Sequence, residues 1–425
     1  MFEVKEKPRL VEKAYLVAVI LREEERANAE SLLDELEELV SNLGIIIFCK
    51  KVVRVRKTFP GYLLGKGKFN EVIEDVGELG CDVIIFDNEL SPSQQRNWEA
   101  ESKVLVIDRQ EIILDVFAAR AQTKEAVLQV KLARLEYSLP RLRRAWTHLG
   151  RQRGGGVTQR GEGEAQIELD QRLVRDQISA TKKEIKQVAK TRKTSRKKRL
   201  RIPLPTVALV GYTNAGKSTL LNQVCNSDVL SADKLFATLD PTTRQVELPL
   251  LEPMLMTDTV GFIQKLPTHL VDSFKATLEE VVEADLLLHV VDASHPQVET
   301  QLDAVHQVLD DIGGLDKPML YVFNKIDEEA GARAARRLAR RFPHTASVSA
   351  KTGEGMDSLM EGIGACLKGR TEELKLSVPL SEGRLLALLQ ERGVILASAY
   401  EGRTAELEVR VSPQLAAQCA RFRVS

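Results

Sequence analysis

Three things are scarce in this 425-residue sequence: cysteine, aromatic side chains, and any apolar stretch long enough to cross a membrane. Its five cysteines have neither CxxC nor histidine spacing, so neither a zinc site nor a disulfide framework is indicated. The first residues, MFEVKEKPRL, carry charges where a signal peptide would be apolar. No window reaches the roughly 18 apolar residues of a spanning helix. We therefore expect a cytoplasmic protein without membrane insertion.

The chain also lacks a net charge, since 61 Lys and Arg balance 61 Asp and Glu. The two signs are unevenly distributed, and residues 182–201 hold eleven basic side chains against one acid, Glu184. One or two basic residues are enough to offset the dipole at a helix C-terminus. The run therefore favours nucleic-acid contact over a merely solvated helix end. Its basic members are Lys182, Lys183, Lys186, Lys190, Arg192, Lys193, Arg196, Lys197, Lys198, Arg199 and Arg201.

The length and the 43% hydrophobic content are those of a globular protein of two or three domains. Residues 1–120 alternate short apolar runs with helical periodicity, which predicts an α/β domain with a mostly parallel sheet. The runs expected to be strands are 14–21, 45–55, 83–87 and 104–108.

Residues 121–200 predict a basic helical hairpin. A continuous helix is expected from about 112 to 148, and a second from about 164 to 199. The loop between them could present backbone and guanidinium donors to RNA phosphates. Trp146 and His148 could stack on bases, although a packing role fits both equally. The loop residues concerned are Gly154, Gly155, Gly156, Gly161 and Gly163, with Arg151, Arg153 and Arg160.

The last two segments are a second alternating α/β domain, 201–370, and a small α+β module, 371–425. The module reads as strand, helix, strand, strand, helix, at 374–378, 383–390, 394–399, 405–411 and 413–422. It carries no catalytic constellation, so a docking or regulatory role is the most that its sequence allows.

A glycine-rich phosphate-binding loop follows the apolar strand 207–210. It satisfies the GxxxxGK[ST] pattern in the strand-to-helix context that this pattern requires. Exposed amides and the helix N-terminus supply partial positive charge to a phosphate, and Lys217 adds a full one. Ser218 can ligate magnesium. The nucleotide-binding residues are Gly211, Tyr212, Thr213, Asn214, Ala215, Gly216, Lys217, Ser218 and Thr219.

A second strand, 254–256, leads into Asp258 and Gly261. The Asp258 carboxylate can hold magnesium through water, and the Gly261 amide can sense a γ-phosphate. In the intervening loop, 236–241, Thr238 is a better candidate than Thr242 or Thr243 to close on the metal. The predicted metal ligands are Ser218, Thr238 and Asp258, and the predicted catalytic residues are Lys217, Thr238 and Gly261.

Two further strand ends predict recognition of guanine. After strand 319–323, Asp327 can accept hydrogen bonds from the ring N–H and the exocyclic amino N–H of guanine. Adenine does not offer this pair of donors, so a buried carboxylate at this position selects guanine. Lys325 can cover the purine face, and Asn324 can brace the loop. After strand 346–348 come Ser349, Ala350 and Lys351, where the Ala350 amide can donate to the guanine carbonyl.

All these fragments follow predicted strands in one order, and open α/β sheets bind ligands at those ends. The sequence therefore predicts a magnesium-dependent GTPase that binds GTP and GDP in a doubly wound P-loop domain. Phe262 stands where many GTPases carry a water-orienting Gln, which predicts slow intrinsic hydrolysis. Asn214 makes potassium a further candidate cofactor, because in GTPases with this residue it can help bind a monovalent cation.

These residues resemble the HflX-type GTPases over nearly the whole chain. The resemblance is carried by GYTNAGKST (211–219), LFATLDPTTR (235–244), DTVGFI (258–263), NKID (324–327) and WTHL (146–149). One departure is Glu162, where the family more usually has Pro. The resemblance implies a partner in the large ribosomal subunit and its rRNA, splitting of stalled ribosomes under stress, and a chain partly associated with ribosomes. GTP would then act as a conformational timer.

Two other readings stay open. One is a ribosome-assembly GTPase of the Obg type, which the hairpin directly upstream of the phosphate loop disfavours. The other is an RNA-binding or scaffold protein whose nucleotide turnover is incidental. In each case we expect a monomer.

Overall fold

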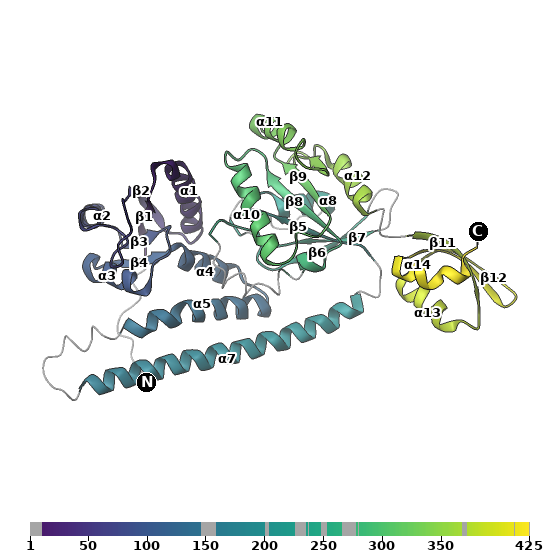
Figure 1. Ribbon diagram of the computed structural model, residues 1–425, viewed down its shortest axis with the longest axis horizontal. Coiled ribbons are helices and arrows are strands. Elements are labelled where there is room, and N and C mark those ends of the chain that lie inside the picture. The colour runs from purple at the N-terminus through teal and green to yellow at the C-terminus, as the bar shows by residue number, and fades with distance from the viewer. Residues whose placement is uncertain are drawn as a thin grey trace. The chain divides into compact units, whose positions relative to one another are not determined.

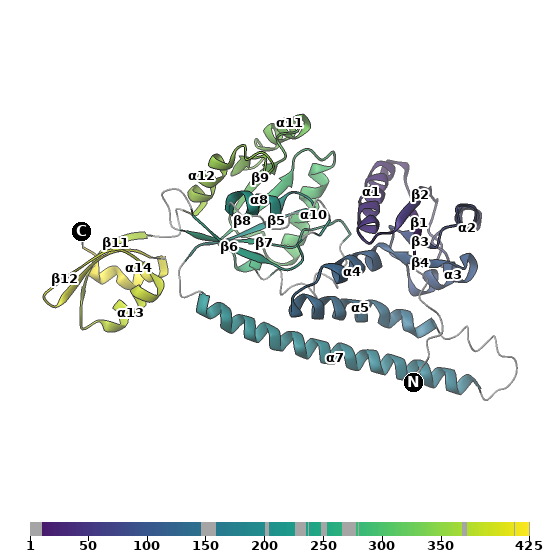
Figure 2. The same ribbon diagram turned by 180° about the vertical axis from the view of Figure 1, so that it is seen from behind.

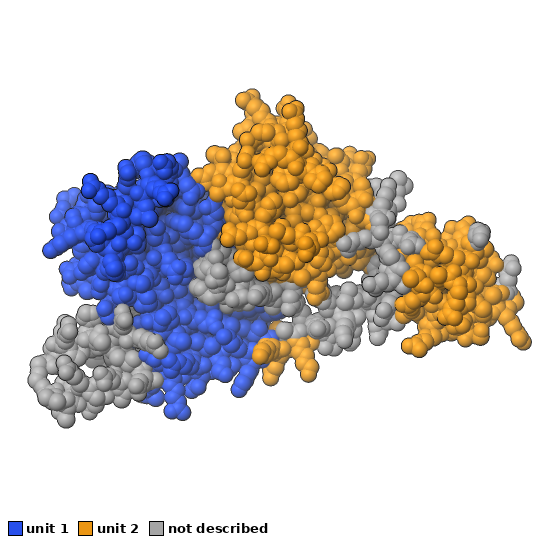
Figure 3. All heavy atoms as spheres, viewed as in Figure 1, with its two compact units in different colours: residues 1–185, 233–239, 264–274 blue, residues 186–232, 240–263, 275–425 orange. Residues whose placement is uncertain are grey.

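The computed structural model describes residues 11–145, 159–199, 204–225, 235–236, 238–247, 253–265, 278, 280–367, 372–411 and 413–424. The chain forms two compact units (Figure 3). Unit 1 contains residues 1–185 with two later segments, 233–239 and 264–274. Unit 2 contains residues 186–232, 240–263 and 275–425.

Unit 1 is built on a four-stranded sheet with helices on both faces, and the parallel sheet with helices packed on it was predicted (Figure 1). All three strand pairings are parallel, in the order β2-β1-β3-β4. One face packs Phe69 and Val72 of α2 and Trp98 of α3 into a shared core. The strands are β1 (Lys13–Ile20), β2 (Ile46–Arg54), β3 (Val83–Phe86) and β4 (Leu105–Asp108). The helices are η1 (Glu23–Glu25), α1 (Arg26–Asn42), α2 (Lys66–Leu79), α3 (Pro92–Ser102) and α4 (Arg109–Arg120).

The expected continuous helix from 112 to 148 is wrong, because α4 ends at Arg120 and α5 (Lys124–Ala145) starts anew. Ala121 is extended, with φ −63° and ψ 118°. Thr123 then begins the next helix, since its Oγ1 accepts from the Ala126 amide at 3.2 Å. Two helices therefore occupy the stretch where one was predicted.

Helix α7 (Gln159–Arg199) starts five residues before the expected 164, so Gly161 and Gly163 lie in the helix and not in the loop. Trp146, His148, Arg151, Arg153 and the triplet 154–156 lie outside the described residues.

Helices α5 and α7 run antiparallel, side by side, as the predicted hairpin (Figures 1 and 2). An ion pair joins them, with Lys182 Nζ 2.8 Å from Glu136 Oε1. The exposed lysines of α7 begin at this level.

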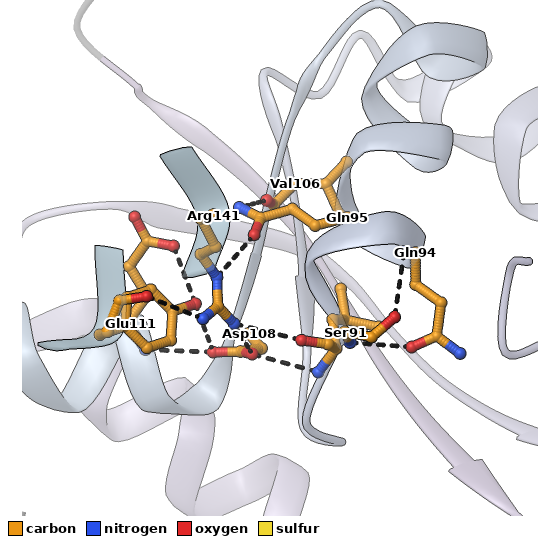
Figure 4. Close-up of polar contacts among 9 residues, drawn as sticks. Ser91, Gln94, Gln95, Val106, Asp108, Glu111 and Arg141 are labelled. Atoms are coloured by element: carbon orange, nitrogen blue, oxygen red, sulfur yellow. Dashed lines mark hydrogen bonds and ion pairs between the residues drawn. The ribbon is translucent and has the colours of Figure 1, made fainter. Parts of the chain in front are cut away.

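A buried polar cluster holds α5 against the sheet of unit 1 (Figure 4). Asp108, at the end of β4, accepts from the Tyr137 hydroxyl at 3.0 Å and from Arg141 Nη2 at 3.2 Å. Arg141 Nε also donates to Gln95 Oε1 of α3 at 2.9 Å. A cavity of about 320 Å³ opens beside the cluster. Burial, together with the Asp108 and Asp115 charges, raises the pKa of the lining Glu111 to about 7.

The larger domain of unit 2 is a six-stranded sheet in the order β10-β9-β8-β5-β7-β6, parallel except for β6. Helices α8 and α12 pack on one apolar cluster, and α10 and α11 on another. This is the predicted doubly wound P-loop domain. Its strands are β5 (Thr206–Gly211), β6 (Thr242–Val246), β7 (Met254–Asp258), β8 (Leu286–Asp292), β9 (Met319–Asn324) and β10 (Thr345–Ser347). Its helices are α8 (Lys217–Cys225), α10 (Val298–Asp311), α11 (Glu329–Leu338) and α12 (Met356–Leu367).

The C-terminal module is an antiparallel three-stranded sheet in the order β11-β13-β12, with its own core. Its elements follow the predicted order: β11 (Glu372–Pro379), α13 (Gly383–Arg392), β12 (Val394–Glu401), β13 (Thr404–Val411), α14 (Pro413–Cys419) and η3 (Ala420–Phe422). No helix in the described parts of the chain has both the length and the apolar character needed to cross a bilayer.

Candidate functional site

The phosphate-binding loop connects β5 to α8, and two of its glycines are sterically required. Gly211 has φ +151°, and a Cβ there would lie 2.2 Å from the Val290 carbonyl oxygen. Gly216 has φ +91°, and its Cβ would lie 2.2 Å from Asn324 Nδ2. Only glycine fits either position, so the loop passes close to the neighbouring strand ends.

Lys217 is buried inside this loop. Its ammonium group donates to the carbonyl oxygens of Gly211 at 3.1 Å and Tyr212 at 2.8 Å. Burial lowers the Lys217 pKa to about 8, against the opposing effect of the Asp258 charge. Phosphate oxygens can replace these neutral carbonyls and compensate the buried charge better. Thr213 Oγ1 is also buried, and no described residue hydrogen-bonds to it.

Two of the predicted metal ligands meet at the start of α8. Ser218 Oγ donates to Asp258 Oδ2 at 2.6 Å, and Asp258 is 2% exposed at the end of β7. A hydroxyl and a carboxylate are hard oxygen ligands of the kind that magnesium takes. In the described parts of the chain no group of three or more His, Cys, Asp or Glu could hold a metal. The pair therefore fits an ion that takes its other ligands from water and nucleotide phosphates.

Gly261 lies against the same loop. The Thr213 amide donates to the Phe262 carbonyl at 2.7 Å, and the Phe262 amide donates to the Gly211 carbonyl at 3.0 Å. A Cβ on Gly261 would lie 2.9 Å from Lys217 Nζ and 2.9 Å from the Thr213 Cα atom, so the Gly261 backbone packs closely against the phosphate-binding loop. The Phe262 ring is 2% exposed and cannot orient a water molecule. Thr238, the third metal candidate, belongs to unit 1.

Asn324 braces the side of the site where base recognition was predicted. Its Nδ2 donates to the Ala215 carbonyl at 2.8 Å, and its Oδ1 accepts from the Ala350 amide at 2.9 Å. A guanine carbonyl would have to share that amide with Asn324. The Ser349 hydroxyl accepts from the Thr352 amide at 3.1 Å, and Lys351 is exposed.

Asp327 is exposed, whereas a buried carboxylate was expected. Asp327 stands one turn beyond β9 and outside the packed core, so its carboxylate would be shielded from water only by a bound base. Sequence reasoning also missed Asp292, the last residue of β8, which pairs with Lys325 Nζ at 2.6 Å. A carboxylate directly after an apolar strand was the signal that could have found it.

Three family models match the chain in order. They are a GTP-binding GTPase N-terminal region at 30–118, a GTP-binding GTPase middle region at 120–199, and a 50S ribosome-binding GTPase at 206–325. A GTP-binding protein from Sulfolobus solfataricus, solved in complex with GDP, is 21% identical with a TM-score of 0.42, over 84% of this chain and 99% of that one.

Curated relatives match over far more than the nucleotide motifs. The GTPase HflX of Akkermansia muciniphila is 46% identical over 94% of both chains. The GTPase HflX of Escherichia coli (strain K12) is 44% identical over 83% of both. Identity at this level across N-terminal region, hairpin and P-loop domain leaves one assignment: this chain belongs to the HflX family of GTPases and hydrolyses GTP.

Proposed function

We propose that this GTPase binds the large ribosomal subunit and uses GTP binding and hydrolysis to time ribosome dissociation or the rescue of stalled ribosomes. The observation that carries the proposal is the row of exposed lysines on α7, directly before the strand that leads into the phosphate loop. Within residues 182–190 of the sequence the only acid is Glu184, and Lys182 also pairs with Glu136 of α5; such a row of exposed ammonium groups matches the phosphates of rRNA. The described members are Lys182, Lys183, Lys186 and Lys190.

This proposal also covers the domain boundaries, the oligomeric state and the location of the protein in the cell. The N-terminal domain is 1–120, the basic hairpin 121–200, the GTPase domain 201–370 and the C-terminal module 371–425. The protein works as a monomer in the cytoplasm and is partly bound to ribosomes. Similarity to a family model described as a 50S ribosome-binding GTPase supports the choice of subunit.

In the proposed mechanism, Lys217 and the amides of 211–219 bind the β- and γ-phosphates, and Ser218, Thr238 and, through water, Asp258 would hold magnesium. Magnesium supplies charge neutralisation on the phosphates. Gly261 donates its amide to the γ-phosphate, and Asp327 accepts from the guanine edge. Ser349 and Lys351 flank the base beside Ala350, Asn324 and Lys325. Loss of the γ-phosphate on hydrolysis releases the Thr238 and Gly261 loops.

Asn214 is the proposed route to potassium. It is exposed at φ +58° at the tip of the phosphate loop, where its side-chain oxygen can ligate a monovalent cation near the reacting phosphates. We expect faster hydrolysis in potassium than in sodium, and loss of that difference in Asn214→Gly, which tolerates the same backbone conformation. Equal wild-type rates in the two salts would remove potassium from the mechanism.

Sedimentation with purified ribosomes tests the proposal, in GDP, GTP and a non-hydrolysable GTP analogue, with the GTPase rate measured in parallel. Changing Lys182, Lys183, Lys186 and Lys190 to Gln should weaken co-sedimentation and flatten its salt dependence. A matched control changes four exposed arginines of the GTPase domain, Arg333, Arg336, Arg337 and Arg340, to Gln. Failure to co-sediment in every nucleotide state would remove the ribosomal role and leave the enzyme class intact.

Two alternatives are separated by the same assay. An Obg-type assembly GTPase would leave mature 70S particles intact with GTP. A scaffold with incidental turnover would bind ribosomes equally in the nucleotide-free variant Lys217→Ala.

A further inference from the structure

Two short segments in unit 1 adjoin residues of the nucleotide site. Phe236, in the segment 233–239, lies two positions before Thr238. Lys265, in the segment 264–274, lies four positions after Gly261. What holds Phe236 and Lys265 therefore limits where Thr238 and Gly261 can go.

Phe236 is packed into unit 1. Its side chain is 2% exposed, and its ring meets Phe117 of α4 edge-on, with centroids 4.6 Å apart. Leu235 and Leu239 on either side are 3% and 2% exposed. An edge-to-face aromatic pair adds specific geometry to the burial of these side chains. The segment is thus held by apolar contacts.

Lys265 is held by charge. Its ammonium group forms an ion pair with Asp87 Oδ2, and the Asp87 side chain is 1% exposed. Asp87 Oδ1 also accepts from Arg109 Nη1 at 2.7 Å. A carboxylate buried this completely needs its cations, because an uncompensated buried charge is strongly destabilising.

The position of Asp87 in the sheet is informative. The strand order β2-β1-β3-β4 reverses between β1 and β3, and Asp87 directly follows β3. Open α/β sheets take their ligands at the carboxyl ends of strands at such a reversal. In this chain two cationic side chains meet Asp87 at this point: Arg109, and Lys265 from a segment that begins beside the nucleotide site.

Both held residues have strained backbones. Phe236 has φ +54° and Lys265 has φ +56°, a left-handed conformation that non-glycine residues rarely adopt. Such strain persists only where the surroundings impose it, and it collects in segments with two arrangements. Gly261 itself lies against Lys217 and Thr213 of the phosphate loop, so the segment that carries Lys265 begins beside that loop.

We propose that Asp87 and Phe117 are positioning residues for GTP hydrolysis: by holding Lys265 and Phe236, they fix the loops that present Gly261 and Thr238 to the γ-phosphate. The inference rests on the roles proposed above for Thr238 and Gly261, and is independent of ribosome binding. It makes the N-terminal domain part of the GTPase machinery through side chains that never touch the nucleotide.

The test uses full-length protein without ribosomes. In Lys265→Met we expect kcat for GTP to fall at least about fivefold, and the affinity for a non-hydrolysable GTP analogue relative to GDP to fall similarly. GDP affinity itself should stay within about twofold, because GDP lacks the phosphate that Gly261 and Thr238 contact. Lys265→Arg should restore most of both losses, since it keeps the charge that Asp87 needs.

Lys50→Met is the matched control, since Lys50 pairs with Asp34 and Glu37 in the same unit, at 2.6 Å and 2.5 Å. It should leave kcat and the affinity ratio unchanged. Phe236→Ala provides an independent second variant and should reproduce the Lys265→Met pattern. The proposal is overturned if Lys265→Met and Phe236→Ala lower thermal stability but keep the kcat of the Lys50→Met control and its ratio of analogue affinity to GDP affinity. It is also overturned if Lys265→Arg loses as much kcat and analogue affinity as Lys265→Met.

Discussion

The lowered pKa of Lys217 makes nucleotide affinity depend on pH in a calculable way. Burial brings this pKa to about 8, so raising the pH from 7.0 to 8.5 removes the proton from most of the nucleotide-free protein. The protonated fraction falls from about 0.9 to about 0.24 over that window. Only the ammonium form can compensate phosphate charge, and the bound phosphates hold it protonated. GDP affinity should therefore fall about fourfold, or about 0.8 kcal/mol.

The sign follows from the direction of the shift. A lysine whose pKa is lowered in the free protein and restored in the complex takes up a proton on binding, and this uptake costs affinity only above about pH 8. The terminal phosphate does not add to the effect, because its own ionisation, near about 6, is nearly complete at pH 7. Staying at or below pH 8.5 also keeps the guanine ring proton in place.

Isothermal calorimetry measures both consequences. Titrations with GDP at pH 8 in two buffers of different ionisation enthalpy should show uptake of about half a proton per nucleotide. Lys217→Arg stays charged throughout, so whatever GDP affinity it keeps should not change between pH 7.0 and 8.5. A flat wild-type affinity over this range, with heats independent of buffer, would refute the burial argument for Lys217.

Three further predictions concern the GTPase domain. Gly216→Ala should weaken GDP binding at least about tenfold in a fluorescence titration, because its Cβ would lie 2.2 Å from Asn324 Nδ2. The control Gly313→Ala has a similar φ of +75° but open space around the added Cβ, so it should bind GDP normally. Equal GDP affinities of the two variants would contradict this prediction. Asp327→Asn should lose at least about a hundredfold in GTP affinity and gain affinity for the xanthine nucleotide, whose carbonyl accepts from the new amide; unchanged preference would exclude Asp327 from base selection. Burial lowers the His289 pKa from 6.5 to about 3, so the imidazole stays neutral in the folded domain, whereas in the unfolded chain it binds a proton below pH 6.5. Acid therefore favours the unfolded chain. Between pH 7 and pH 5 the free energy of unfolding in urea should drop by about 2 kcal/mol more in wild type than in His289→Leu.

The nucleotide site could be predicted because its chemistry is local. Each candidate group follows an apolar run of a few residues, and the strand expected at 207–210 lies within β5 at 206–211. A strand end fixes the direction of the next few residues, so Lys217, Asp258 and Asn324 converge once the strands are parallel neighbours. The solvent exposure of the individual site residues could not be predicted from the sequence. Asp327 lies outside the core because the turn after β9 leaves the sheet, and nothing in NKID itself signals that.

The break between α4 and α5 shows the opposite case. Apolar periodicity runs through residues 112–142 almost without interruption, so a period-based reading sees one helix. Packing decides otherwise, because Tyr137 and Arg141 must return to Asp108 at the end of β4, which a straight helix would not allow (Figure 4). Propensity is a weak prior, and a buried carboxylate with two partners to satisfy outweighs it.

The contacts of Phe236 and Lys265 were beyond sequence reasoning for a further reason. Lys265 is 178 residues from Asp87, and neither residue belongs to a pattern that names its partner. These contacts nevertheless bear on the proposed ribosomal role through thermodynamic reciprocity. If holding Lys265 and Phe236 in unit 1 favours the γ-phosphate by a given free energy, the γ-phosphate favours that packing of unit 1 by the same amount. Since unit 1 also contains the start of the lysine row, at Lys182 and Lys183, GTP can then set the state of the proposed ribosome-binding surface without contacting it.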